Sequence, residues 1–379
     1  MDVCSKEFSS AEDESMLAMD AVYVSKQSAC TDNPSEEPST VSSASTEVNE
    51  EPQEAEIKPE PTELKREETP KYTLRAELMG CNGPITSVKF SPNGRLVAAG
   101  SVDKSFRVWE AHGQYAELTK CRSHSAGIND IAWSRDNRYL ASCGDDGVVK
   151  VYDLQWTKRK LAIQCHDKYI MSVAFNTQGT LLLTASFDNT AKMWDMRSGD
   201  CVASLEEHKQ PLSCASFNHD SSMIVTTSYD ATTILWDTRT AGYLKILEMA
   251  DDDGKPLPSG FAKFSPNGRY ILAAKSNSKM CMLDAKKAKV VRTYEGHLNQ
   301  DYCVVADFSI TGRKCIVSGS ENGNIYVWDM QTCELLQVIK GSPGGSPVLA
   351  VDSNRHYNMI ASASIGSGDK IVRLWRSEA

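Results

Sequence analysis

The chain of 379 residues carries 41 Lys and Arg against 50 Asp and Glu, a formal net charge of −9, and 12 cysteines. This charge balance does not favour direct nucleic-acid binding, and no apolar run is long enough to span a membrane. The N-terminus lacks the features of a signal peptide, and no two cysteines form a Cys-x-x-Cys pair. We therefore expect an intracellular protein with reduced thiols and no metal site.

The first 70 residues differ in composition from the rest. They hold 18 Asp and Glu against five Lys and Arg, with many Ser and Pro and no apolar period. Such a segment buries too little apolar surface to offset the entropy of ordering it, so we predict a disordered acidic tail over residues 1–70. Within it, the sequence from Ile57 to Glu60 matches the hydrophobic-Lys-x-acidic pattern of SUMO acceptors, which makes Lys58 a candidate acceptor.

From residue 71 onwards one short pattern returns seven times. Its anchors, which are Trp or a residue in the place of Trp, are separated by 42 to 47 residues and lie at Trp109, Tyr152, Trp194, Trp236, Leu283, Trp328 and Trp375. An aromatic marker repeats in step upstream of six of them, at Phe90, Trp133, Phe175, Phe217, Phe264 and Phe308. A period of roughly 40–45 residues with a Trp-Asp signature predicts an all-β, seven-bladed WD-repeat propeller over residues 71–379.

Each unit predicts four short strands. In residues 166–208 we expect them at 170–175, 180–185, 191–195 and 201–205. The last unit offers only three strands, whereas the alternating segment 72–78 belongs to no unit. We therefore expect segment 72–78 to complete the last blade, which leaves no unpaired edge at the closure of the ring.

Four polar residues in each ideal unit are expected to form one buried hydrogen-bonded network of His, Ser or Thr, Asp and Trp. Units three and four contain all four members: His166, Thr184, Asp188 and Trp194, then His208, Thr226, Asp230 and Trp236. Unit two has His124, Ser142 and Asp146 with Tyr152, and unit six has His297, Ser318 and Trp328 with Asn322 in place of Asp. Units one and five lack the His, so apolar packing alone is expected to hold them. These histidines are interpreted as core residues and not as ligands or catalysts.

No catalytic or cofactor-binding motif is present, so we expect neither an enzyme nor a cofactor. Two Trp-Asp-x-Arg segments, which end at Arg197 and Arg239, resemble the motif of substrate receptors of cullin-RING ubiquitin ligases. Because Trp-Asp comes with the repeat, only the two arginines carry information. A ligase receptor therefore remains one alternative function, and a propeller adaptor outside chromatin is another.

Several segments resemble the family of WD-repeat protein five, the scaffold of COMPASS/MLL-type histone methyltransferase complexes. The likeness covers about residues 72–379 and is strongest at 88–94, 263–274, 316–321 and 360–363. It implies a non-catalytic nuclear scaffold, with some cytoplasmic protein, that is monomeric within a hetero-complex modifying lysine four of histone three. The implied partners are a peptide of the catalytic subunit, a retinoblastoma-binding-type subunit and a histone tail.

The resemblance implies that one mouth of the central channel grips an arginine between two Phe rings. In this chain those rings are replaced by Met171 and Val305, and two Ser positions are replaced by Asn129 and Gly260. The positions that are kept are Asp145, Ser213, Tyr229, Phe261, Tyr302 and Cys303. Without the two rings, we expect arginine binding to be weakened.

On the opposite face the family binds an acidic-hydrophobic peptide of the retinoblastoma-binding subunit. The corresponding positions, all identical or close in type, are Asn267, Tyr270, Met282, Phe308, Ile310 and Gln331. We expect this face to be the retained binding site, and the protein to be a divergent relative with a changed balance of partners.

Overall fold

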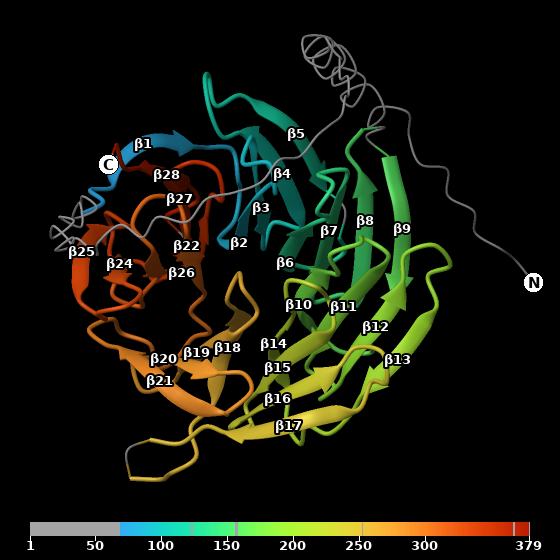
Figure 1. Cartoon of the computed structure of the whole chain (residues 1–379). Helices are drawn as coiled ribbons and strands as arrows, with labels where there is room; N and C mark the ends of the chain where they lie inside the picture. Colours follow the sequence, from blue (N-terminus) through green and yellow to red (C-terminus); the bar gives the residue numbers. More distant parts are fainter. Residues whose placement is uncertain (1–68, 123, 156–157, 252, 367, 379) are drawn as a thin grey trace, which may run out of the picture.

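The computed structural model describes residues 69–378, apart from 123, 156, 157, 252 and 367. The described residues form 28 strands in seven four-stranded antiparallel sheets, arranged as blades around a central channel (Figure 1). The predicted seven-bladed, all-β propeller is confirmed. Residues 1–68, which make up all but the last two residues of the predicted tail and include Lys58, lie outside the described residues.

Each of the first six blades uses four consecutive strands. Blades one to three are formed by β2 (Ile85–Phe90), β3 (Leu96–Ser101), β4 (Ser105–Glu110), β5 (Glu117–Arg122), β6 (Ile128–Trp133), β7 (Tyr139–Gly144), β8 (Val148–Asp153), β9 (Lys158–Gln164), β10 (Ile170–Phe175), β11 (Leu181–Ser186), β12 (Ala191–Asp195) and β13 (Cys201–Leu205). Blades four to six are formed by β14 (Leu212–Phe217), β15 (Met223–Ser228), β16 (Thr232–Asp237), β17 (Tyr243–Glu248), β18 (Ser259–Phe264), β19 (Tyr270–Lys275), β20 (Lys279–Asp284), β21 (Lys289–Tyr294), β22 (Ala306–Ser309), β23 (Cys315–Ser318), β24 (Asn324–Asp329) and β25 (Leu335–Lys340).

The seventh blade combines both ends of the propeller. Its sheet has the order β1 (Thr73–Leu78), β28 (Val372–Arg376), β27 (Met359–Ser364) and β26 (Val348–Ser353), and β1 lies beside β28 in Figure 1. Tyr72 anchors this closure, because its hydroxyl donates to Asn358 Oδ1 at 2.7 Å and lies 3.2 Å from Ser309 Oγ. Segment 72–78 therefore occupies the place in the ring that the sequence predicts.

The core lies between neighbouring blades, because the middle strands are buried on both faces. In β11 every residue after Leu181 is buried, whereas four of the five residues of the outer strand β13 are not. One apolar cluster joins Leu183 of blade three to Ile224 and Trp236 of blade four. Burying apolar surface between sheets on this scale is the main favourable term in the stability of the ring.

The predicted polar network is present in blades three and four. In blade three, His166 Nδ1 lies 2.6 Å from Asp188, its Nε2 lies 2.7 Å from Thr184 Oγ1, and Trp194 Nε1 donates to the same Oγ1 at 3.0 Å. His208, Asp230, Thr226 and Trp236 repeat this arrangement in blade four. These histidines are core residues in the described structure, as the sequence predicts.

Blade two keeps the network without the Trp. His124 lies 3.0 Å from Asp146 and 2.8 Å from Ser142 Oγ. Burial alone would raise the pKa of Asp146, but the hydrogen bond and charge of His124 and backbone N–H donors outweigh it and lower the pKa to about 2. This carboxylate therefore stabilises the fold while it is ionised.

The network predicted for blade six is wrong. Among the described residues neither ring nitrogen of His297 has a hydrogen-bond partner, and burial lowers its pKa to about 4. Trp328 Nε1 donates to the Glu295 carbonyl instead. The cause is the replacement of the turn Asp by Asn322, whose amide donates to the Tyr326 hydroxyl at 2.8 Å and leaves no carboxylate for the histidine.

The expectation that apolar packing alone holds blade one is also wrong. Arg107, which is 4% exposed, donates to both oxygens of Glu117 at 2.7 and 2.8 Å. Arg373 plays the same part in blade seven, where it contacts Glu77 at 3.1 Å and Asp369 at 2.8 Å. These two blades thus use a buried arginine where blades two to four use a histidine.

Candidate functional site at the two ends of the channel

In the described structure, a cavity of about 710 Å³ follows the channel and is lined by the innermost strand of every blade or by residues adjoining it. Nine of the ten positions predicted for the arginine-binding mouth line it: Asn129, Met171, Ser213, Tyr229, Gly260, Phe261, Tyr302, Cys303 and Val305. The tenth, Asp145, accepts a hydrogen bond from Asn129 Nδ2 at 2.8 Å. The sequence positions therefore converge at one end of the channel, called the channel mouth below.

The channel mouth lacks a pair of facing rings. Met171 and Val305, both half-buried, replace them, and a Cβ at Gly260 would stand only 3.0 Å from Cys303 Cα. The Tyr229 hydroxyl lies 3.2 Å from Cys303 Sγ, and burial raises the pKa of this tyrosine. Without rings at these two positions, a guanidinium held between them loses roughly 0.5–2 kcal/mol of stacking per ring.

Sequence reasoning missed a row of rings beside the channel mouth. The ring of Phe187 lies 6.1 Å from that of Tyr229 and 6.0 Å from that of Tyr169, measured between centroids. Tyr169 is 53% exposed. The turn position of Phe187 reads as part of the repeat, and only the spatial proximity of these three rings distinguishes it.

The channel interior carries charges that the sequence analysis did not single out. Lys263 Nζ lies 2.6 Å from Asp307, whose other oxygen accepts from the Ser353 N–H of the next blade at 2.9 Å. Asp352 accepts from the Phe90 N–H at 2.7 Å, across the closure of the ring. Burial and the nearby Asp307 raise the pKa of Asp352 to about 7.

At the other end of the channel lies the Tyr270 face, defined by Asn267, Tyr270, Met282, Phe308, Ile310 and Gln331. Met282 and Phe308 are 1% and 5% exposed and belong to one apolar cluster, against which Tyr270 packs. They form the floor beneath the surface and are not themselves open to a ligand. Ile310 is 39% exposed, and Asn267 and Gln331 are exposed, so the accessible part of the Tyr270 face is mixed apolar and amide.

Cations surround the Tyr270 face. The guanidinium of Arg269 lies 5.3 Å above the Tyr270 ring, and Arg292 Nε donates to the Gln331 carbonyl at 3.0 Å. The other nearby cations, in the turns of blades five and six, are Lys286, Lys287, Arg313 and Lys314. The neighbouring Asp284 and Asp329 are each 6% exposed, and Glu334 is the exposed carboxylate of these described turns, so cations outnumber anions on the accessible surface.

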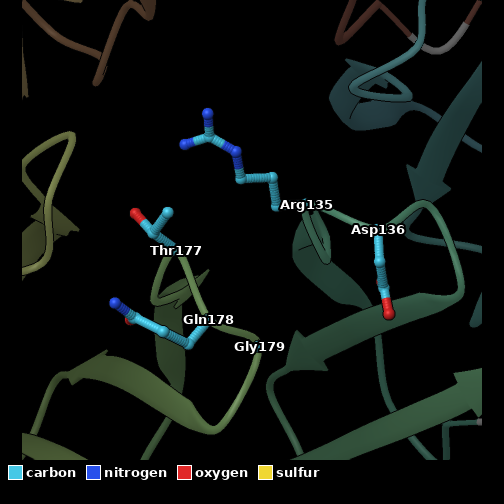
Figure 2. Close-up of a pocket in the computed structure, with 5 residues that line it drawn as sticks. All are labelled: Arg135, Asp136, Thr177, Gln178 and Gly179. Atoms are coloured by element: carbon cyan, nitrogen blue, oxygen red, sulfur yellow. The ribbon is translucent and has the colours of Figure 1, made fainter. Parts of the chain in front are cut away.

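Figure 2 shows a smaller pocket, of about 270 Å³, between the turns of blades two and three. The side chains of Arg135 and Thr177 project into it, whereas Asp136 turns away and accepts a hydrogen bond from Ser134 Oγ at 2.5 Å. Its remaining lining is Gln178 and Gly179. These residues do not form a pair of nucleophile and base.

Two properties of the described residues bear on function. They contain no group of three or more His, Cys, Asp or Glu side chains placed to hold a metal ion. They also contain no helix long and apolar enough to cross a membrane. What the described chain does offer is a ring with two accessible, chemically different ends, the architecture of propellers that act as protein-interaction scaffolds.

The seven four-stranded blades and the His-Asp-Trp networks within them define a WD-repeat β-propeller. The family model described as the WDR5 beta-propeller domain matches residues 77–376, and the chain belongs to this WD-repeat family.

Similarity to individual proteins is more local. A stretch of 102 residues, 24% of this chain, is 30% identical to nuclear distribution protein PAC1 of Arthroderma benhamiae and covers 22% of that protein. A stretch of 121 residues, 28% of this chain, is 31% identical to protein HIR1 of Cryptococcus neoformans and covers 14% of it. The periodic tryptophan protein 2 homolog of Caenorhabditis elegans is 27% identical over 81 residues, 21% of this chain and 9% of that protein. The chain thus matches less than a quarter of each relative's length.

Proposed function

We propose that the protein is a nuclear scaffold subunit of a histone lysine methyltransferase complex acting on lysine four of histone three. It binds an acidic-hydrophobic peptide of a retinoblastoma-binding-type subunit at the Tyr270 face and holds the catalytic subunit or a histone tail only weakly at the channel mouth. The match of the WDR5-type family model over residues 77–376 supports the choice of complex.

The observation that carries the proposal is the chemistry of the Tyr270 face. Ile310 is partly exposed and the Tyr270 ring packs on the buried floor that contains Phe308, so both offer apolar contact. The guanidinium of Arg269 lies over the Tyr270 ring and that of Arg292 contacts the Gln331 carbonyl, which places two cations where acidic side chains would lie. Complementary charge speeds encounter and selects partners, while the apolar contact supplies affinity. A peptide that alternates acidic and apolar residues satisfies both requirements at once.

The channel mouth offers less to an arginine. Loss of stacking on two rings costs about 1–4 kcal/mol, which corresponds to roughly 10- to 1,000-fold in affinity. Met171 keeps a polarizable contact, and Asp145 keeps a carboxylate near the entrance. An arginine-bearing peptide of the catalytic subunit therefore binds as a secondary partner.

The ligase alternative rests on Arg197 and Arg239, which are exposed in the turns that follow β12 and β16. Their exposure makes them accessible to a ligase adaptor, but exposure alone gives no specificity for such a partner. Affinity purification of the full chain from nuclei, followed by mass spectrometry, separates the proposals. Methyltransferase-complex subunits are the expected partners, whereas recovery of a cullin adaptor, or of neither set, contradicts the proposed function.

A further inference from the structure

The acidic N-terminal segment joins the propeller beside the Tyr270 face. The Tyr72 hydroxyl lies 3.2 Å from Ser309 Oγ, and Ser309 stands between Phe308 and Ile310 in the chain. The Tyr72 N–H also donates to Gln337 Oε1 at 2.8 Å, in the outer strand of the same blade six. Whatever precedes Tyr72 therefore starts at the edge of this face and not at the channel mouth.

The charges of the two ends differ. The turns of blades five and six around the Tyr270 face present Arg269, Lys286, Lys287, Arg313 and Lys314. The loops on the side of the channel mouth present exposed carboxylates at Asp145, Asp167, Glu206, Glu207, Glu295 and Asp301. These carboxylates outnumber the exposed Lys168 and Lys209 of the same loops, so a polyanionic segment is attracted more strongly to the Tyr270 face than to the loops at the mouth.

Residues 47–64 have the composition that the Tyr270 face would bind. They contain seven Glu with Lys58 as the only cation, and Val48, Ile57 and Leu64 supply apolar side chains between the charges. The centre of this segment lies between Ala55 and Glu56, 16 to 17 residues before Tyr72. A flexible linker of that length has a root-mean-square span of about 20 Å, which brings the segment to a face that begins next to Tyr72.

We propose that residues 47–64 bind the Tyr270 face of their own chain and compete there with the acidic-hydrophobic partner. The intramolecular contact follows from the charges and the tether alone, whereas its competitive role rests on the proposed function. A short tether gives an effective concentration on the order of 1 mM, so even a segment that binds with a dissociation constant of about 0.1 mM lowers the apparent affinity of the partner by roughly tenfold.

Zero-length carbodiimide cross-linking of the full chain, read by peptide mass spectrometry, tests the contact without any partner. Glu side chains of residues 47–64 are expected to link to Lys286, Lys287 or Lys314 at low salt, and these links are expected to fall several-fold at high salt. Lys168 and Lys209, which are equally exposed at the loops of the channel mouth, are the matched control acceptors. Links that are absent, or as frequent to the control lysines, overturn the contact.

A charge-matched pair of full-length variants tests the competition. Glu50→Gln, Glu51→Gln, Glu54→Gln and Glu56→Gln together are expected to tighten binding of an acidic-hydrophobic peptide about tenfold by calorimetry. Glu7→Gln, Glu12→Gln, Asp13→Asn and Glu14→Gln remove the same charge near the chain start and are expected to change it less than twofold. Equal effects of both sets overturn the competition. A peptide that binds neither variant contradicts the proposed function instead, and the cross-linking result stands apart from it.

Discussion

The two ends of the channel differ in the side chains and the charges that they present. At the channel mouth, the side chains that would stack on a cation are replaced by Met171 and Val305, and the surrounding loops are acidic. At the Tyr270 face, the buried floor of Met282 and Phe308 is intact and arginines surround it. The strands between the two ends are shared, so each end can change its partners without altering the core that supports the other.

Restoring the rings at the channel mouth should produce the largest change. The double substitution Met171→Phe, Val305→Phe is expected to tighten an arginine-bearing peptide by about 10- to 1,000-fold, because each added ring stacks on the guanidinium. Calorimetry with the same peptide in which Arg is replaced by Ala provides the control. No change in affinity would mean that the rings are not what the mouth lacks.

The polar networks that support the channel mouth differ between blades, and two His→Ala substitutions expose the difference. His166→Ala removes a partner from Asp188 and from Thr184, and it should lower the free energy of unfolding by about 1–3 kcal/mol. His297→Ala leaves a similar cavity, but no partner among the described residues loses a hydrogen bond. It should therefore lower the free energy of unfolding by less. Urea unfolding of both variants measures the order, and the reverse order would refute the assignment.

Asp352 in the channel interior is expected to make stability fall as the pH rises, whereas the carboxylates of the blade networks make it fall as the pH drops. Because the pKa of Asp352 is raised to about 7, its protonated form is favoured in the fold, and stability is lost as pH rises from about 4 to 7. Asp352→Asn keeps an acceptor for the Phe90 N–H and removes the titration. Between pH 5 and pH 8 its stability should rise relative to the unmodified chain by about 1–3 kcal/mol. A constant difference would contradict the raised pKa.

Asp146 supplies the matched case in blade two. Its pKa is lowered to about 2, so it stabilises the fold above its unfolded value near 4, and this contribution is lost as pH falls from about 4 to 2. At pH 6 the free energy of unfolding of the unmodified chain should therefore be about 1–2 kcal/mol higher than that of Asp146→Asn. This difference should disappear as the pH falls to about 2. Denaturant unfolding of both proteins at several pH values measures this difference. A difference that grows in acid would contradict a stabilising, ionised Asp146.

A charge placed on the Tyr270 face should have the smallest effect of the set. Ile310→Glu is expected to weaken an acidic-hydrophobic peptide by about tenfold, because it removes apolar contact and adds a like charge. Leu244→Glu makes the same change at a position 54% exposed on β17, away from this face, and should leave binding unaltered. Equal losses in the two variants would point to a general charge effect.

Regular features of the repeat were readable from the sequence. The seven regularly spaced anchors from Trp109 to Trp375 predicted the number of blades, and the unassigned segment 72–78 indicated how the ring closes. The complete networks of blades three and four also followed, because all four members stand at constant offsets within one unit.

Features that depend on contacts between units were not readable. Asp307 and Asp352 lie in adjacent blades and 45 residues apart, so their shared burial emerges only when the sheets are placed. In blade six, three network residues were present, but the loss of one carboxylate redirected the others. At the Tyr270 face, Met282, Phe308 and Ile310 are all apolar, so their residue types do not show that the first two are buried and that Ile310 is accessible.

The central claim is that the Tyr270 face, and not the channel mouth, is the main binding end of this propeller. Calorimetry of the unmodified full chain with two peptides, one acidic-hydrophobic and one bearing a free arginine, tests it most directly. We expect measurable binding of the acidic-hydrophobic peptide and at least tenfold weaker binding of the arginine peptide. Tight binding of the arginine peptide with none of the acidic-hydrophobic peptide would contradict it.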